Sequence, residues 1–290
     1  MSATETGVRP VPDEVVVRRR PWSGAGRWAG GGAVVLLAAM LTHTLATNPR
    51  FEWDVVGGHL FDETILLGVW RTIQLTMVSM AIGLVLGTVL AVMRMSPNPL
   101  LAGAAWSYVW FFRATPLLVQ LLFWYNLAAL YPDLSLGIPF GPDLVSVPSE
   151  RLVNAFTAAI LGLALHQAAY TAEIVRAGIL AVDPGQREAA TALGMSRMLA
   201  LRRVILPQAM RAIVPPVGNE FVSMLKTTSL VSIIALPELL YSAQIIYART
   251  YQTIPLLLVA TMWYLALTAA LSAAQHYIES HYGRGYGRSR

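Results

Sequence analysis

Ionisable and hydrogen-bonding side chains interrupt two long apolar stretches of this 290-residue chain. In the first stretch, His166, Tyr170 and Glu173 are spaced four and then three residues apart. This spacing places them on one face if the stretch is helical. Such groups are costly inside an apolar segment and often mark the route of a polar solute. A carboxylate beside aromatic rings suits an ammonium group.

The second stretch carries a similar face, formed by Asn219, Ser223 and Lys226. Lys226 or the neighbouring hydroxyl groups can hold a carboxylate, so the two stretches predict a polar cavity for a small zwitterion. The alternative is that these polar residues only join helices, because polar contacts between membrane helices are common. The candidate pathway residues are Gln120, His166, Gln167, Tyr170, Glu173, Asn219, Glu220, Ser223, Lys226 and Thr227.

A basic loop between these stretches, residues 183–207, predicts two short helices with a break between them. Asp183 suits an N-cap, and Gln186 follows it by three residues, as in a capping box. Gly194 can take the left-handed conformation that ends a helix, and Ser196 can cap a second one. A helix–glycine–helix element at a membrane surface has a shape suited to docking another protein. An ordinary amphipathic hairpin at the interface is the alternative.

The second helix of this loop is expected to be amphipathic. Its arginines fall mostly on the side opposite to an apolar stripe. The stripe consists of Met198, Leu201, Val204 and Ile205.

The composition indicates an integral membrane protein. The chain is 56% hydrophobic and only 13% charged, which is too apolar for a soluble domain of this length. It has no cysteine, which excludes a disulfide framework, a thiol catalyst and a cysteine-ligated metal site. The net charge of +5 does not indicate nucleic-acid binding, because the basic residues divide among several loops.

The chain lacks the phosphate-binding loop that an ATP-driven pump needs. Its single lysine, Lys226, follows a leucine instead of the glycine of G-x-x-x-x-G-K-[ST]. There is also no H-E-x-x-H and no G-x-S-x-G sequence. We therefore expect a transport subunit with no catalytic residue and no metal or cofactor of its own. If ATP drives the transport, ATP and magnesium are used by a separate ATPase chain.

Six segments are apolar enough to span a bilayer, which takes about 20 residues each. The first, 29–47, follows a basic tail, 1–28, expected to be disordered in the cytoplasm. Its apolar run is too long for a cleaved signal peptide. The other five belong to a core over 64–282, in which Pro116 should kink or restart one helix, and a proline-rich outer loop, 132–151, follows it. The five core spans are expected at 64–93, 114–131, 153–175, 213–236 and 255–275.

The distribution of arginine predicts the orientation. With the amino terminus inside, the inner stretches hold sixteen of the 20 arginines, a clear positive-inside bias. Both termini and the loop at 183–207 are then cytoplasmic, in a multi-pass protein of the cell (cytoplasmic) membrane. The inner stretches are 1–28, 94–113, 176–211 and 276–290.

Four stretches give the chain a resemblance to a known family. The loop looks like the EAA loop of ABC importer permeases, and the four together resemble the polar amino acid branch, the histidine/glutamate/glutamine type. Val204 stands where the original loop pattern has isoleucine, and Ala114 where the family often has glycine. The four stretches are Phe112 to Gln120, Ala169 to Ile179, Glu188 to Pro207, and Gly218 to Leu230.

The resemblance implies an all-α fold with the five-helix core of a type I ABC importer permease and one additional N-terminal helix of unassigned role. It implies a pore formed with a second permease subunit, the same or a similar chain, two ATPase subunits, and an extracytoplasmic binding protein that delivers a polar amino acid. In the loop, Glu188 would contact the ATPase and Gly194 would set the angle between two coupling helices. The implied coupling residues are Glu188, Ala189, Ala190, Gly194, Leu206 and Pro207.

Two other functions remain open from the residues alone. Glu173, Glu220 and Lys226 would also suit an ion-coupled secondary transporter that acts without an ATPase. A membrane scaffold, in which the polar faces only join helices, is the third hypothesis. The sequence leaves open which amino acid is carried and whether the permease pairs with itself.

Overall fold

The computed structural model describes residues 24–137 and 143–282, which form two units, residues 1–51 and 52–290. In the first unit, helix α1 (Gly24–Thr47) is followed by the short turn η1 (Pro49–Phe51). The part of α1 from Trp28 to Thr47 is exposed and apolar enough to span a membrane. A helix over 29–47 was predicted and is confirmed, whereas most of the predicted basic tail lies outside the described residues.

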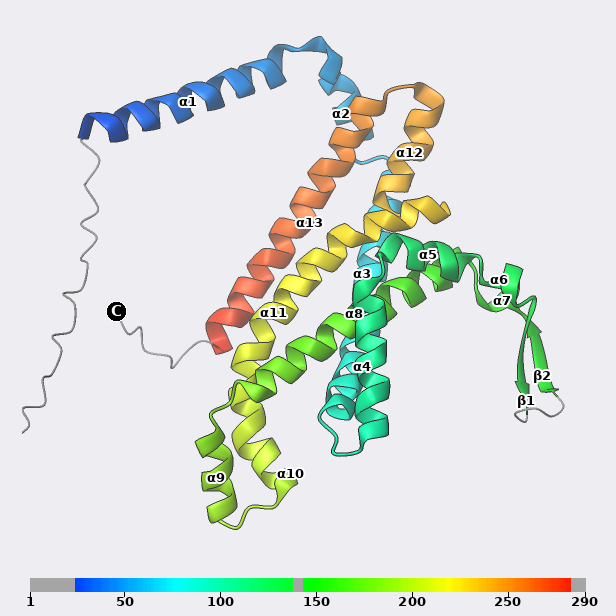
Figure 1. The fold of residues 1–290 in the computed structure, drawn as a ribbon. Helices are drawn as coiled ribbons and strands as arrows, with labels where there is room; N and C mark the ends of the chain where they lie inside the picture. Colours follow the sequence, from blue (N-terminus) through cyan, green and yellow to red (C-terminus); the bar gives the residue numbers. More distant parts are fainter. Residues whose placement is uncertain (1–23, 138–142, 283–290) are drawn as a thin grey trace, which may run out of the picture. The chain divides into compact units, whose positions relative to one another are not determined.

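The second unit is a bundle of long helices (Figure 1). Helices α9 and α10 lie at one end of this bundle, and α2 and α12 lie at the other. Its helices are α2 (Trp53–His59), α3 (Glu63–Arg94), α4 (Pro99–Ala114), α5 (Leu117–Tyr125), α6 (Leu127–Leu130), α7 (Ser149–Leu152), α8 (Ala155–Leu180), α9 (Pro184–Ala192), α10 (Arg197–Ala200), the π turn η2 (Leu201–Ile205), α11 (Leu206–Thr227), the 3-10 segment η3 (Thr228–Ile234), α12 (Leu239–Thr250) and α13 (Thr253–Tyr282).

Helices α3 and α8 pack closely along the centre of this unit, and glycines on α3 permit the approach. A Cβ atom at Gly87 would lie 2.5 Å from Cβ of Thr171 and 2.7 Å from the carbonyl oxygen of Ala168. A Cβ atom at Gly83 would lie 2.8 Å from the side chain of Gln167. Small residues at helix crossings are the usual way to bring membrane helices together.

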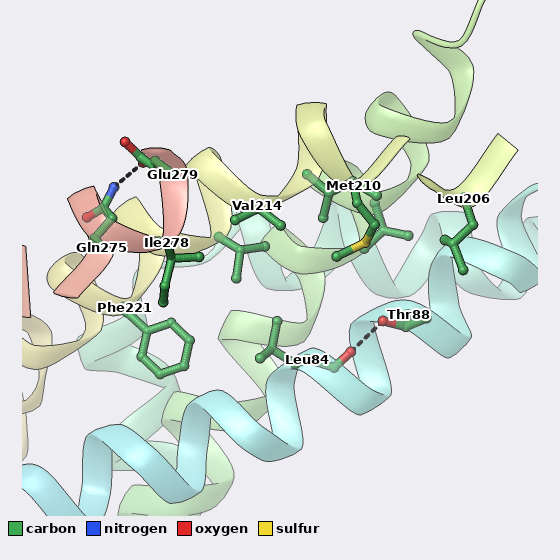
Figure 2. Close-up of a pocket in the computed structure, with 13 residues that line it drawn as sticks. Leu84, Thr88, Leu206, Met210, Val214, Phe221, Gln275, Ile278 and Glu279 are labelled. Carbon is green, nitrogen blue, oxygen red and sulfur yellow. Dashed lines mark hydrogen bonds between the residues drawn. The ribbon is translucent and has the colours of Figure 1, made fainter. Parts of the chain in front are cut away.

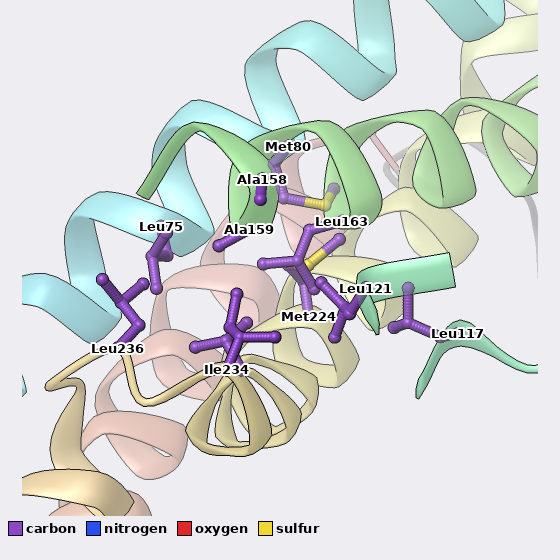
Figure 3. Packing of buried hydrophobic residues seen from close by; sticks show 11 residues of the cluster. Leu75, Met80, Leu117, Leu121, Ala158, Ala159, Leu163, Met224, Ile234 and Leu236 are labelled. Atoms are coloured by element: carbon purple, nitrogen blue, oxygen red, sulfur yellow. The ribbon is translucent and has the colours of Figure 1, made fainter. Parts of the chain in front are cut away.

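The largest apolar cluster joins α3, α5, α8 and the segment from α11 to η3 (Figure 3). Leu75, Leu121 and Leu163 are fully buried in it. The cluster fixes the N-terminal half of α8, and thereby the position of the polar residues that follow on this helix.

Four described helices are long and apolar enough to cross a membrane, and the bent pair Arg197–Ile234 and Leu239–Thr250 would be a fifth. The bounds predicted for the third core span, 114–131, are wrong. Helix α4 ends at Ala114, α5 has only nine residues, and Asn126 separates it from α6. The predicted restart at Pro116 is confirmed, because proline supplies no N–H to continue α4.

The segment predicted as an outer loop, 132–151, contains an antiparallel hairpin of β1 (Asp133–Gly137) and β2 (Asp143–Pro148). The backbone N–H of Ser149 donates to the carbonyl of Pro132 at 2.8 Å and closes the base of the hairpin. The hairpin therefore leaves and re-enters the helical bundle at one place.

A buried carboxyl group stabilises the break between η3 and α12. Glu238 is fully buried and accepts hydrogen bonds from the hydroxyl of Tyr264 at 2.8 Å and from the backbone N–H of Tyr241 at 2.9 Å. Thr72 on α3 accepts from the backbone N–H of Leu239 at 3.2 Å. The side chain of Glu238 thus joins the start of α12 to α13, and the side chain of Thr72 joins the start of α12 to α3.

Candidate functional site

The loop at 183–207 forms two helices separated by a glycine, as predicted. The carboxylate of Asp183 accepts from the N–H of Gly185 at 2.7 Å and caps α9. Gly194 has φ of +72°, and the N–H of Met195 donates to the carbonyl of Ala190, as in a Schellman motif. The expected reciprocal bond from Gln186 is replaced by another contact, because its side chain accepts from Gln208 at 3.1 Å.

The predicted span that begins at residue 213 left the second helix of the loop separate from it. In the structure this helix continues past Pro207. It runs from α10 through the π turn η2 directly into α11, and Ser196 caps its start. Pro207 lacks the N–H that would bond to the carbonyl four residues earlier, and the N–H of Leu206 bonds five residues back, to Leu201. Helices α10 and α11 are therefore joined through η2 as one continuous helical segment.

Apolar side chains are exposed at the tip of this loop. Leu193 is 81% exposed and Met198 64% exposed, so Met198 does not belong to a buried stripe, whereas Leu201, Val204 and Ile205 are half-buried. Exposed apolar side chains gathered on a surface loop are typical of a protein contact. Of the predicted coupling residues, Ala190 is buried, and the exposed ones are Glu188, Ala189, Gly194, Leu206 and Pro207.

The polar face of α8 contributes to a cluster of charges. The carboxylate of Glu173 accepts from Arg176 at 3.0 Å and 3.2 Å on one oxygen, and from Arg94 at the end of α3 on the other. All three side chains are partly buried. One carboxylate therefore bridges two helices and balances only part of the positive charge.

Arg113, near the end of α4, adds a third guanidinium to this cluster. It lies 5.3 Å above the ring of Tyr170, a cation–π contact. Among the described residues no carboxylate lies within ion-pair distance of Arg113. This cation is therefore available to an anionic group.

Two adjoining cavities open beside these charges, and both are lined by Arg113 and Glu173. The first, of about 350 Å³, is also lined by Tyr170 and by two tryptophans of α4. The second, of about 460 Å³, lies between α8 and α11, where Ala212 and Pro216 line it. We define these two cavities together as the charged recess.

A polar stripe on α11 continues from the charged recess. Asn219, Ser223 and Lys226 are exposed and follow Ala212 and Pro216 at helical spacing, which places all five on one face. Glu220 and Thr227 are half-buried beside this stripe. Polar groups on a membrane helix are not stable against lipid, so this face needs either water or a further protein chain against it.

Other predicted pathway residues serve the packing of the helices. The buried Gln120 donates through Nε2 to the carbonyls of Phe112 and Thr115, which lie at the break between α4 and α5. The buried Gln167 fits against Gly83 and contacts Thr171. Gln120 therefore supplies a donor to the carbonyls at the helix break, and Gln167 packs at the crossing of α3 and α8.

His166 belongs neither to the lining of the charged recess nor to the packing glutamines. Its ring is 5.0 Å from that of Tyr170. Within the described residues its buried Nδ1 has no partner. It therefore contacts Tyr170, a lining residue of the charged recess, without lining either cavity itself.

A different cavity, of about 370 Å³, lies between α3, α11 and α13 (Figure 2). Its walls are mostly apolar, and its polar side chains Gln275 and Glu279 bond to one another at 2.7 Å at one side. Gln275 also donates to Asn219 at 2.9 Å. A zwitterion would gain few partners there, so we assign the candidate site to the charged recess.

The sequence analysis did not include three arginines of the site. Arg94 was counted only as an inner positive charge, and Arg113 and Arg176 only as inner charges and as members of the family-like stretches. The signal that the sequence offered was the position of Arg113, two residues before the break at Thr115-Pro116. A long side chain at the end of a helix points back toward the start of that helix, and so into the bundle.

Comparison with known proteins shows extensive similarity. A family model described as binding-protein-dependent transport system inner membrane component matches residues 83–284. The arginine transport system permease protein ArgU of Corynebacterium glutamicum is 47% identical over 283 residues, 97% of this chain and 86% of the relative. The nopaline transport system permease protein NocM of Agrobacterium fabrum is 39% identical over 208 residues, 72% of this chain and 83% of the relative.

Solved structures agree with these relatives. A chain of an amino acid ABC transporter with histidines superimposes with a TM-score of 0.65 at 38% identity, covering 75% of this chain and 94% of that one. A chain of the MetNI methionine ABC transporter, at 20% identity and a TM-score of 0.60, covers 76% of this chain and 96% of that one, and shares the fold.

Proposed function

The chain belongs to the family of binding-protein-dependent transport system inner membrane components, and from this premise we propose its substrate, its route and its partners. It is a membrane permease subunit of an amino acid ABC importer and not an enzyme. The substrate is a polar amino acid, with arginine as the first candidate because the relative that is 47% identical is named an arginine permease.

One observation carries the assignment of the route: Arg113 and Glu173 have opposite charges and line the same two cavities. An amino acid zwitterion fits this arrangement, with its carboxylate at Arg113 and its cationic group toward Glu173. Tyr170 supports Arg113 through its ring. The polar stripe of α11 continues this route toward the other end of the bundle.

The exposed tip of the α9–α10 loop is the docking site for a separate ATPase subunit, where ATP and magnesium are used. Glu188 and the apolar side chains Leu193 and Met198 contact the ATPase, and Gly194 fixes the angle between α9 and α10. Since α10 continues into α11, closure of the ATPase moves α11, and with it the polar stripe and one wall of the charged recess. The loop and both termini are cytoplasmic in this arrangement.

A second permease subunit covers the polar stripe. Asn219, Ser223 and Lys226 are exposed in the single chain, and polar side chains of this kind do not face lipid. Two permease chains with these faces opposed would enclose a polar route. An extracytoplasmic binding protein delivers the amino acid to its outer end.

The test is uptake of radiolabelled L-arginine into proteoliposomes that hold this permease with its cognate ATPase and binding protein. ATP should drive uptake by the complex. Arg113→Ala and Glu173→Gln should each lower kcat/KM for arginine by about tenfold or more, because the first removes a charge-assisted contact to the carboxylate and the second removes the negative charge that offsets the arginines around the cationic group. Ser146→Ala, on the exposed hairpin, is the matched control and should leave uptake unchanged.

Two results would overturn this function. Gradient-driven uptake by the permease alone would favour the ion-coupled secondary transporter. Unchanged complex assembly and uptake in a variant that combines Glu188→Ala with Gly194→Asp would exclude the docking role of the loop.

A further inference from the structure

Two consecutive prolines inside α11 leave a gap in its hydrogen bonding. Pro215 and Pro216 have no N–H, and a residue of an α-helix normally donates to the carbonyl four residues earlier. The carbonyls that lose these donors belong to Arg211 and Ala212. A carbonyl at membrane depth that loses its helical donor needs another partner.

Only one of the two carbonyls belongs to the wall of the charged recess. Ala212 and Pro216 line the cavity that Arg113 and Glu173 also line, whereas Arg211 and Pro215 are not among its lining residues. The carbonyl that Pro216 leaves without its helical donor therefore belongs to a residue that lines the charged recess.

The other acceptor of the charged recess is already engaged. Each oxygen of Glu173 accepts from an arginine, one from Arg94 and the other from Arg176. Arg94 and Arg113 line the recess together with this one carboxylate, and Arg176 contacts the recess only through Glu173. A cationic group that enters therefore needs a further acceptor, and a backbone carbonyl provides one without adding charge.

We propose that the carbonyl oxygen of Ala212, released by Pro216, binds the cationic part of the transported amino acid, while Arg113 holds its carboxylate. This inference rests on the proposed function and names a binding group within its site. The α-ammonium and a side-chain guanidinium are both charged N–H donors, so either satisfies the same carbonyl.

The test restores the missing helix donor at each proline in turn. Pro216→Ala supplies an N–H that bonds to the carbonyl of Ala212 and removes it from the recess. Pro215→Ala, the matched control, restores the equivalent bond to Arg211, outside the recess. Each substitution removes a helix-breaking residue, so both variants should fold.

The measurement is ATP-driven uptake of radiolabelled L-arginine by the reconstituted complex of permease, ATPase and binding protein. Pro216→Ala should lower kcat/KM by about tenfold, as expected for a lost hydrogen bond to a charged group, and Pro215→Ala should stay within about twofold of the wild type. ATPase activity stimulated by the binding protein should be similar in the two variants, because both keep the helix continuous.

Uptake of L-citrulline, which keeps the α-ammonium but has a neutral side chain, separates the two sources of the contact. A loss for both substrates assigns the carbonyl to the α-ammonium, and a loss for arginine alone assigns it to the guanidinium. Equal kcat/KM in the two proline variants overturns the inference and leaves the proposed function standing. No ATP-driven uptake by the wild-type complex would instead contradict the proposed function.

Discussion

At the residue scale, a single buried carboxyl group decides the packing at the end of the bundle opposite to the α9–α10 loop. Glu238 is fully buried, and such a group is tolerated only when hydrogen bonds satisfy it. Its donors come from Tyr264 on α13 and from the first turn of α12. The sequence analysis did not single out Glu238.

We expect Tyr264→Phe to lower the free energy of unfolding by about 1–3 kcal/mol, because it leaves a buried carboxyl group without one donor. Tyr251→Phe is the matched control, because Tyr251 is 90% exposed and should change stability little. Thermal unfolding of the purified permease in detergent measures both. Equal midpoints for the two variants would contradict this role of Glu238.

At the element scale, the crossing of α3 and α8 depends on a position without a side chain. Gly87→Ala should destabilise the protein by about 1–3 kcal/mol, the usual cost of overpacking, because the new methyl group would meet Thr171 and a backbone carbonyl of α8. Gly103→Ala on α4, where nothing lies within 4 Å, should be neutral or stabilising. Thermal unfolding compares the two variants, and a stable Gly87→Ala protein would show that the helices can separate freely.

The α9–α10 turn depends on backbone conformation. Gly194 has φ of +72°, which costs a β-branched residue about 1–2 kcal/mol or more. Gly194→Val should therefore reduce binding-protein-stimulated ATPase activity of the complex several-fold, while Gly194→Asn, which tolerates this conformation, should keep most of it. Similar losses in both variants would point to a side-chain clash at the docking surface instead.

At the scale of the whole molecule, the two ends of the bundle should face opposite sides of the membrane. The chain has no cysteine, so single cysteines can be labelled on a clean background. A membrane-impermeant maleimide should label Ser146→Cys in intact cells and Leu193→Cys only after the membrane is opened. Labelling of Leu193→Cys in intact cells would place the docking loop outside and end the coupling proposal.

The sequence by itself determined the membrane class, four of the long helices, the restart at Pro116 and the capped α9–α10 loop with its left-handed Gly194. These features depend on local properties, namely apolar length, missing backbone donors and caps, which neighbouring residues decide. It also predicted the face of α8 that holds Tyr170 and Glu173, because helical spacing alone fixes which residues share a face.

Only the tertiary structure decided which polar residues meet. It paired Glu173 with Arg94, 79 positions away in the sequence, placed Arg113 over Tyr170, and turned Gln120 and Gln167 into packing groups. It also joined α10 to α11 across Pro207. Such contacts depend on where whole helices cross, and the close approach at Gly83 and Gly87 that sets the crossing is visible only once α3 lies against α8.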